Sequence, residues 1–359
     1  MKNLIRFYNE QRVNFLNQAA SNNKTDVANF VDNDPTKISW TRGLRNNLKN
    51  NKTAIFREDQ IREIIYRPFI KQRVYYDKFF IESPGQNSKF FPTANSKNLL
   101  ITISGNGGVK DFYTLMTNSI RDLDTYGGCQ CFPLYYYEEN DQAQKGLFDS
   151  GDNSDYIRRD GVSDFILERA KKQYGKNVTK EDVFYYVYGL LHCPDYREMF
   201  ANDLKKMLPR LPLVDDVRDF WKFSKAGREL TELHINYEAV PAYDGLTVKG
   251  AESEFYTVTK MKFPKKDQKE TIIYNSKIVI SNIPAAAYEY VVNGKSAIEW
   301  IMERYAVTTH KDSGIKNDPN DWATEVENPR YILDLVLSII NVSVQTVEII
   351  KRLPKVKFE

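Results

Sequence analysis

Hydrophobic residues in the first twenty positions recur at roughly helical spacing, and neither proline nor glycine interrupts them. We therefore predict a helix over residues 2–20. A polar, turn-rich segment follows at 21–37. Beyond it, short runs of β-branched and aromatic residues are typical of strands. These predicted strands lie at 37–40, 72–82, 98–105, 111–120 and 128–139.

The spacing changes again after a polar segment at 140–163, which has almost no hydrophobic periodicity and is the best candidate for a boundary. Helical periodicity dominates beyond it, and the pattern at Thr179 resembles a capping box. The predicted helices lie at 162–175, 179–192, 195–208, 214–240, 288–305 and 330–353. Two further predicted strands lie at 254–264 and 271–284.

This order of elements indicates an α+β fold. A mixed, strand-rich N-terminal region precedes a largely helical region that contains a second small β patch. We expect three parts: a helix at 1–22, a subdomain at 36–139, and a mainly helical subdomain at 160–359 with strands near 254–283.

Composition narrows the class of protein. The chain is 42% hydrophobic and 13% aromatic, which predicts a sizeable core. No run approaches the roughly 18 apolar residues of a membrane span, and the charged, amphipathic N-terminus does not resemble a signal peptide. Three cysteines are too few for a disulfide framework. We expect a reduced, cytoplasmic protein without a membrane partner.

The net charge of +3 is unevenly distributed. Residues 37–110 contain 14 Lys and Arg against 5 Asp and Glu, a net charge of +9, whereas residues 138–359 contain 32 against 36, a net charge of −4. A basic first third suggests a surface that faces a polyanion such as DNA. The alternative is a basic face that is merely solvated.

A short predicted helix at 41–51, with Thr41 as a candidate N-cap, carries the clearest DNA-binding pattern. Basic residues recur there every three or four positions, with asparagines among them. Arginine can read guanine, asparagine can read adenine, and lysine holds phosphate. The candidate DNA-binding residues are Arg42, Arg45, Asn46, Lys49 and Lys52, followed by Arg73, Lys89, Lys97 and Lys110.

A nominal nuclease signature, Pro194-Asp195 followed by Asp203-Leu204-Lys205, is the main catalytic alternative. Such a nuclease needs its carboxylates on neighbouring strands, where they converge on Mg²⁺. Here they lie in helical patterns, and Asp203 and Lys205 are two positions apart, so their side chains diverge. We expect a helix, a turn and a second helix instead.

The cysteines and histidines suggest no catalytic or metal site. His192 and Cys193 are adjacent, and neighbours on one segment rarely chelate together. Cys129 and Cys131 share one face of a strand but lack two further clear ligands. The same scarcity argues against a Cys–His nucleophile pair. We predict no catalytic residue and no metal ligand in this chain.

Phosphate-binding and methyltransferase motifs are incomplete. The glycine-rich stretch at 104–112 lacks the Gly-Lys-Ser/Thr of a Walker loop, and we interpret it as a tight turn whose backbone could approach a phosphate. No Pro-Pro dipeptide occurs, so the Pro-Pro-aromatic loop of a DNA amino-methyltransferase is missing. The chain should therefore not transfer methyl groups by itself.

Two long stretches resemble the specificity region of Type ISP restriction-modification enzymes, which combine a nuclease, a helicase and an adenine methyltransferase in one polypeptide. "YRPFIKQRVYYD" at 66–77 is similar to that family's Tyr-Arg-Pro-Phe signature. "YVYGLLHCPDYREMFANDLKKMLPRLPLV" at 186–214 is similar to its second signature. "LIRFYNEQ" near the start and the region around 102–139 also fit. The resemblance covers roughly residues 1–350.

The resemblance implies sequence-specific recognition of double-stranded DNA by a non-catalytic target-recognition domain. The assignment of 36–139 as the basic, DNA-facing subdomain rests on its charge and not on the resemblance. It places S-adenosylmethionine, ATP and Mg²⁺ in upstream domains that this sequence lacks, and it makes the 1–22 helix a joint to an upstream methyltransferase. We expect no cofactor in this chain. Whether the chain belongs to a longer polypeptide or is encoded separately stays open.

A third possibility is a protein-interaction module that docks methyltransferase or helicase–nuclease domains. It would use Leu4, Phe7 and Phe15 of the N-terminal helix, together with the C-terminal helices. This role is compatible with DNA recognition, because a specificity domain must also hold its catalytic partner.

Overall fold

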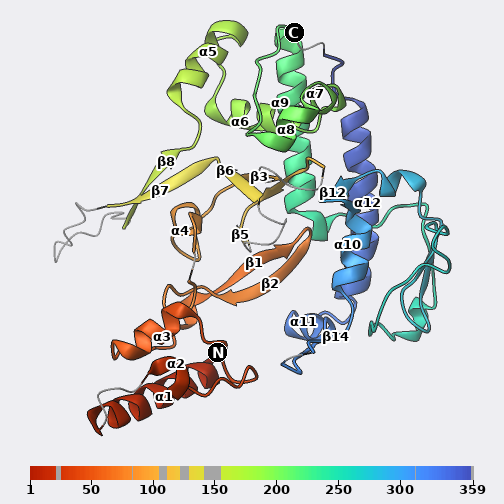
Figure 1. Ribbon diagram of the computed structural model, residues 1–359. Helices are drawn as coiled ribbons and strands as arrows, with labels where there is room; N and C mark the ends of the chain where they lie inside the picture. The colour runs from red at the N-terminus through yellow and green to blue at the C-terminus, as the bar shows by residue number, and fades with distance from the viewer. Residues whose placement is uncertain are drawn as a thin grey trace, which may run out of the picture.

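The N-terminal helices form a unit of their own at one end of the molecule. A computed structural model of the protein describes residues 1–21, 26–82, 84–104, 111–121, 129–140, 155–311 and 313–356. Within these residues, α1 (Lys2–Ser21), α2 (Val27–Phe30) and α3 (Arg42–Lys49) lie side by side at the lower left of Figure 1. The helix predicted at 2–20 is thus confirmed, as is the one at 41–51.

A β-hairpin connects this unit to the rest of the protein. Strands β1 (Ile61–Arg67) and β2 (Ile70–Tyr75) pair antiparallel, and β5 (Ile120–Arg121) adds to β1 in parallel. At the hairpin tip, Phe69 adopts a positive φ of 61° and is 1% exposed. Its ring packs edge-on against Tyr237, so the tip is anchored in the core of the protein.

Two further sheets complete the strand-rich region. One has the order β4-β3-β6, and the other pairs β7 with β8 in a ribbon that projects at the left of Figure 1. The segment predicted as a polar boundary, 140–163, therefore contains a strand. The elements are β3 (Leu100–Ser104), β4 (Thr114–Thr117), β6 (Cys129–Pro133), β7 (Tyr135–Glu139), β8 (Tyr156–Asp160) and the short helix α4 (Asn87–Phe90).

Helices α6 and α9 pack closely, and α9 and α12 run side by side through the molecule (Figure 1). Gly189 of α6 and Gly227 of α9 meet at the α6–α9 contact: a Cβ on Gly189 would lie 2.2 Å from the carbonyl oxygen of Phe223. The helices are α5 (Asp164–Tyr174), α6 (Lys180–Leu190), α7 (Pro194–Met199), α8 (Ala201–Lys206), α9 (Val217–Ile235), α10 (Ala297–Arg304), α11 (Asn320–Glu325) and α12 (Tyr331–Lys351).

The second β patch is a small antiparallel sheet of order β10-β11-β9. Two short hairpins follow it along the chain. The strands are β9 (Thr247–Lys249), β10 (Ile272–Ile273), β11 (Val279–Ser281), β12 (Val291–Val292), β13 (Lys295–Ser296), β14 (Thr308–Thr309) and β15 (Lys316–Asn317). Single 3₁₀ turns are η1 (Glu58–Gln60), η2 (Tyr237–Ala239), η3 (Ala251–Ser253) and η4 (Ala285–Tyr288).

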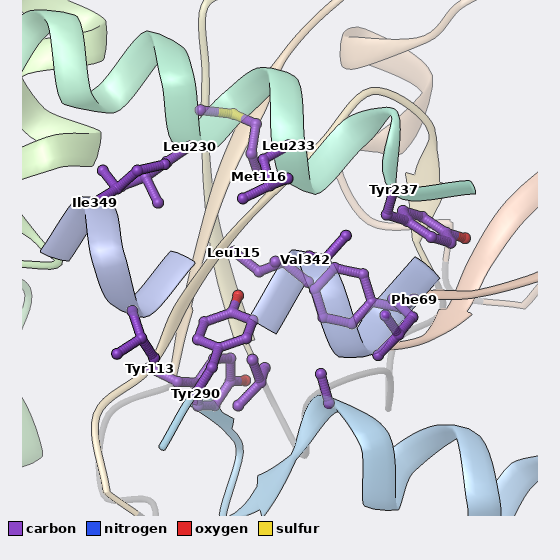
Figure 2. Packing of buried hydrophobic residues seen from close by; sticks show 14 of the residues in the cluster. Phe69, Tyr113, Leu115, Met116, Leu230, Leu233, Tyr237, Tyr290, Val342 and Ile349 are labelled. Carbon is purple, nitrogen blue, oxygen red and sulfur yellow. The ribbon is translucent and has the colours of Figure 1, made fainter. Parts of the chain in front are cut away.

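The largest hydrophobic core joins strands and helices from both predicted subdomains. Figure 2 shows Leu115 and Met116 of β4 among side chains of α9 and α12, including Leu230 and Val342. Phe69 of the β1–β2 hairpin enters the same cluster. A separate cluster lies within α1–α3 and their loops, and a small one lies under the β1–β2 sheet. The observed α+β architecture agrees with the sequence.

Several predicted elements are wrong in detail. Residues 37–40 are not a strand: Ile38 and Trp40 are buried, but no neighbouring segment pairs with them among the described residues. Residues 254–264 form only one isolated bridge, Lys262 to Ile273. The predicted helix at 195–208 breaks at Phe200 into α7 and α8.

The predicted helix at 288–305 begins only at Ala297. The preceding residues form the β12–β13 hairpin, whose turn residues Asn293 and Gly294 have positive φ values of 52° and 79°. An Asn-Gly pair between short apolar runs is a strong hairpin signal, which the helical periodicity obscured.

Helix α12 corrects the expectation that no segment has the character of a membrane span. Residues Tyr331–Lys351 are long and apolar enough to cross a membrane by length and composition. However, 78% of the apolar window is buried inside the protein, where it packs against α9, α10 and η4. Its apolar character is accounted for by its place in the core.

Candidate nucleic-acid interface

A capping residue fixes the start of helix α3, and two leucines determine which of its sides is buried. The hydroxyl of Thr41 accepts a hydrogen bond from the backbone N–H of Leu44 at 3.2 Å, which confirms the predicted N-cap. Leu44 and Leu48 lie four positions apart on one side of the helix, and both are buried. The opposite side therefore faces solvent.

The N-terminal core holds α3 firmly against α1. Leu48 and Tyr8 are completely buried there, and the hydroxyl of Tyr8 donates to the backbone carbonyl of Lys52 at 3.0 Å. At the other end of the helix, the carboxylate of Glu82 accepts from the backbone N–H of Gly43 at 2.9 Å. An anchored helix presents its outer side chains in a defined orientation, which direct reading of bases requires.

The outer face of α3 is basic and unpaired. Arg42, Asn46, Lys49 and Lys52 are exposed, and Arg45 is half-buried with a guanidinium nitrogen 3.4 Å from the side-chain oxygen of Asn33. Within the described part of the chain, none of these four cations forms an ion pair. Their charges are therefore not neutralised by any described residue and remain available to phosphates or bases.

The other candidate residues are distributed over different elements. Lys89 lies on α4 and Lys97 in the loop before β3, and both are exposed. The carbonyl of Lys97 accepts from the hydroxyl of Tyr137, so this loop is fastened to β7. Lys110 lies outside the described residues, as does most of the glycine-rich stretch at 104–112.

The side chain of Arg73 contacts other residues of the protein. Its guanidinium lies 2.5 Å from the carboxylate of Glu325 and stacks near the ring of Trp322, 5.7 Å from the centroid. The structure thus groups the α3 residues on one surface and does not add Arg73 to it.

Lys78 is a further basic residue near α3 that the sequence did not suggest as a candidate. It is exposed and forms no ion pair within the described ranges. The neighbouring Phe79 lies beside α3, where its carbonyl accepts from the side-chain amide of Asn47 at 3.5 Å. The aromatic residues around Lys78 indicate in the sequence that this turn packs against a core. The proximity of Lys78 to α3 depends on tertiary packing and has no local signal.

His192 and Cys193 have structural roles. Burial, together with the nearby charge of Arg197, holds the pKa of His192 well below its ordinary range, and its Nδ1 donates to the backbone carbonyl of Tyr188 at 2.9 Å. Burial raises the pKa of the Cys193 thiol, which is opposite to what a nucleophilic cysteine requires. The stretch at 186–214, which resembles the second signature of the family, therefore contributes buried residues to the core.

The acids of the nominal nuclease signature have separate partners. The carboxylate of Asp195 accepts from the backbone N–H of Val356 at 3.1 Å. Asp203 lies on α8, and Lys205 on the same helix reaches Asp111 at 3.6 Å. As predicted, these residues lie on helices rather than on neighbouring strands.

No metal site can be assigned among the described residues, because three or more His, Cys, Asp or Glu side chains do not converge there. The pair at Cys129 and Cys131 lies on β6 opposite β3, and the guanidinium of Arg121 donates to the sulfur of Cys129 at 2.8 Å. An arginine donor at this sulfur does not suit a site for a cation.

The hydrophobic residues predicted to form a docking surface on the terminal helices are mostly not exposed. Phe15 of α1 is buried, and Leu4 and Phe7 pack against the N-terminal core. Helix α12 is almost entirely enclosed. The hydrophobic residues of these helices are used inside the chain itself.

Comparisons with known proteins agree on one family. The model of the Type ISP C-terminal specificity domain matches residues 1–335. No curated protein matches the chain. Solved structures do: a nuclease-deletion mutant of the Type ISP restriction-modification enzyme LlaGI in complex with a DNA substrate mimic is 39% identical, with a TM-score of 0.82 over 100% of this chain.

Two other similar structures are also complexes. The ATP-dependent Type ISP restriction-modification enzyme LlaBIII bound to DNA is 37% identical over 100% of this chain, with a TM-score of 0.85. The DrdV–DNA complex is 27% identical over 99%, with a TM-score of 0.81. This chain spans 31%, 22% and 33% of the LlaGI, LlaBIII and DrdV chains, respectively. Because the family model matches most of its length, this chain belongs to the family of Type ISP C-terminal specificity domains.

Proposed function

We propose that this chain recognises a short sequence in double-stranded DNA and acts as the specificity domain of a restriction-modification enzyme. The single observation that carries the proposal is the outer face of the anchored helix α3, where Arg42, Arg45 and Lys49, with Lys52 just after the helix, form no ion pair with any described residue. An α-helix fits the major groove, where arginine and asparagine distinguish base pairs. The DNA complexes of LlaGI, LlaBIII and DrdV support this assignment.

The remaining candidates hold the duplex in place. Lys49, Lys52, Lys89 and Lys97 contact phosphates, which fixes the register of α3 without reading sequence. Arg42, Arg45 and Asn46 reach the base edges. This division predicts that arginine substitutions change which sequence is preferred, whereas lysine substitutions change affinity for all sequences.

The test is selection of the full chain against a random-duplex library at two salt concentrations. Wild-type protein should enrich an asymmetric motif that survives the higher salt. Arg42→Ala with Arg45→Ala should weaken discrimination by about 10- to 100-fold, since one bidentate base contact contributes about 1–3 kcal/mol. Unchanged discrimination would move the reading residues elsewhere, to the loops near Lys89 and Lys97.

A matched control lies on α5, at the opposite end of the molecule from α3 (Figure 1). Arg169→Ala with Lys172→Ala removes the same charge from another exposed helix. It should leave the selected motif intact. If both double variants weaken discrimination equally, the effect reflects overall charge and not reading by α3.

We further propose that the chain has no catalytic site of its own, and that S-adenosylmethionine, ATP and Mg²⁺ serve other parts of a longer polypeptide. The helical placement of Asp195 and Asp203 supports this. Asp203→Ala should leave DNA binding unchanged, and the wild-type chain should not cleave DNA when Mg²⁺ is added. Mg²⁺-dependent cleavage that disappears in Asp203→Ala would restore the nuclease alternative.

A docking function is a second candidate, favoured by an apolar groove between β6, α5, α6 and the segment after α8. The groove has a volume of about 390 Å³, and Phe132, Leu208 and Leu211 on its walls are about 40% exposed. Such surfaces mark interaction sites. Leu208→Asp with Leu211→Asp should abolish capture of the nuclease–helicase–methyltransferase portion of a Type ISP polypeptide while DNA binding persists; retained capture would remove this candidate.

A further inference from the structure

The second β patch presents lysines on one outward face. Residues paired across antiparallel strands point to the same side of a sheet. Lys249 pairs with Val279, Val279 pairs with Ile273, and Ile273 forms a bridge with Lys262. This register places Lys249 and Lys262 on the same side, at opposite edges of the small sheet.

The other side of the sheet is buried, so the lysine side is the outer one. Ile272 and Ile280 are completely buried in the main core, and Met261 is 3% exposed. In contrast, Ile273 and Val279 are only half-buried. The alternation of buried and half-exposed residues is what a sheet with one solvated face shows.

Lys277 extends the same surface. It lies in the turn between β10 and β11, where the side-chain oxygen of Asn275 accepts from the backbone N–H groups of Lys277 and Ile278, both at 2.8 Å. A Cβ on Gly250 would lie 2.0 Å from the carbonyl oxygen of Lys277. The backbone after Lys249 therefore runs directly against this turn.

Three more exposed lysines flank the sheet along the same segment. We call the six residues the lysine face: Lys249, Lys260, Lys262, Lys265, Lys266 and Lys277.

The lysine face is not neutralised by the protein. None of the six lysines forms an ion pair in the region 241–311, which the structure describes completely, or with any other described residue. Four acids share the segment, and none of them pairs with these lysines; the acids are Glu252, Glu254, Asp267 and Glu270. By contrast, the neighbouring Lys269 is paired with Glu299 at 2.8 Å. Like charges held close together repel one another, and a bound polyanion relieves that repulsion.

We propose that the lysine face binds the phosphate backbone of duplex DNA, independently of sequence, as a second contact besides α3. This inference rests on the proposed function. Lysine holds phosphate as a point charge, and the segment 249–277 that carries the lysine face contains no arginine to read guanine. The one asparagine of this segment, Asn275, is occupied by backbone groups, since its amide donates to the carbonyls of Phe255 and Thr257.

The position of the lysine face determines which DNA it meets. Residues 249–277 lie in the teal segment at the right of Figure 1, whereas α3 lies at the lower left. One duplex reaches both surfaces only if it extends beyond the stretch that α3 reads. The lysine face should therefore strengthen binding to long duplexes more than to short ones.

The decisive variant of the full chain is Lys249→Gln, Lys262→Gln and Lys277→Gln together. Glutamine keeps most of each side chain and removes the charge, so the circular dichroism spectrum and melting temperature should not change. A control with the same charge change replaces three other exposed lysines with glutamine: Lys172, Lys176 and Lys206. These three also lack ion pairs within the described ranges.

The measurement is fluorescence anisotropy with random-sequence duplexes of about 40 and about 12 base pairs, or roughly 136 and 41 Å at 3.4 Å per base pair, over a range of salt concentrations. The triple variant should reduce the slope of log K against log salt by about 2–3 on the long duplex, because each lost phosphate contact removes about 0.9. The short duplex and the control variant should show little change. If the triple variant keeps the wild-type slope on the long duplex, the proposal that the lysine face binds phosphates is wrong.

The same experiment separates this inference from the proposed function when library selection is run on both proteins. If a motif is enriched and the slope of the triple variant is unchanged, sequence recognition is supported and DNA binding by the lysine face is contradicted. If the chain binds without a motif and the triple variant has a reduced slope, DNA binding by the lysine face is supported and sequence recognition is contradicted. Failure of the wild-type chain to bind any duplex would overturn both.

Discussion

Arg73 in strand β2 is joined to Glu325 in α11, 252 positions later in the chain, by an ion pair of 2.5 Å. Lys71 on the same strand pairs with Glu238 at 2.7 Å. The β1–β2 hairpin that carries the N-terminal unit is thus fastened at its tip by Phe69 and along β2 by two ion pairs. These contacts fix the orientation of α3 relative to the rest of the molecule.

We predict that Arg73 serves this attachment more than it serves DNA. Both side chains of the Arg73–Glu325 pair are nearly half-exposed, so the pair should contribute only about 0.2–1 kcal/mol. Arg73→Ala and Glu325→Ala, measured singly and together by urea unfolding, should show a coupling energy in that range. Arg73→Ala should also leave the salt slope of DNA binding unchanged, unlike Lys49→Ala. Zero coupling with a reduced salt slope would return Arg73 to the DNA interface.

The close approach of α6 and α9 predicts a strong effect of very small substitutions. A Cβ on Gly227 would lie 1.9 Å from the carbonyl oxygen of Tyr185, so Gly227→Ala must push the helices apart. We expect a loss of about 2–3 kcal/mol in the free energy of unfolding. Gly43→Ala in α3 is the matched control, because its new Cβ would meet its nearest neighbours at 3.7 Å. That substitution should be neutral or stabilising by about 0.5–1 kcal/mol; equal losses at both positions would contradict the close approach.

Two buried histidines predict a loss of stability in mild acid. His234 lies in a buried chain of hydrogen bonds that fixes its tautomer: its Nε2 donates to the hydroxyl of Thr346 at 2.9 Å, and its Nδ1 accepts from the hydroxyl of Tyr188 at 2.6 Å. Burial lowers the pKa of His234 to about 3, and burial together with the charge of Arg197 also lowers that of His192. Between the folded pKa and the ordinary value near 6.5, the unfolded chain binds more protons. Stability is therefore complete above pH 6.5 and falls as the pH decreases.

The expected fall from pH 7 to pH 5, measured by urea unfolding, is roughly 2 kcal/mol for His234, and His192 should add to it in the same direction. This window lies above the pH at which most carboxylates titrate. His192→Met should reduce the fall, because it deletes a buried ring whose Nε2 has no hydrogen-bond partner among the described residues. His310→Gln is the control substitution, because that side chain lies at an exposed position. A free energy that stays level between pH 7 and pH 5 would rule out this account.

Local signals in the sequence predicted local structure well. Thr41 and Thr179 mark the starts of α3 and α6 because their hydroxyls cap the neighbouring backbone, an interaction that spans only three residues. The helical periodicity of α1 and α12 reflects their buried faces directly. The family signatures could also be recognised in the sequence, and the structure shows that they serve the scaffold. Phe69 anchors a hairpin tip in the core. Gly189 lacks a side chain, so that helix α9 can approach α6 closely.

Interactions between distant segments could not be predicted in the same way. Residues 37–40 have strand-like composition, but a strand forms only with a partner, and that depends on the tertiary fold. The pairing of Arg73 with Glu325 has no local signature. The sequence did not indicate the lysine face, because residues 138–359 are slightly acidic on average. Only the sheet register, which aligns Lys249 with Lys262, and the turn that carries Lys277 reveal it.

The separate N-terminal core has a consequence for how a protein of this kind acquires a new target. Helix α3 rests on Leu44 and Leu48 within a cluster that is distinct from the one around α9 and α12. Its outward side chains can therefore be exchanged in many combinations without transmitting a packing defect to the large core. With α3 as the proposed reader of the target, this architecture would separate heritable change in target choice from the stability of the scaffold, so that a new specificity would require no new fold.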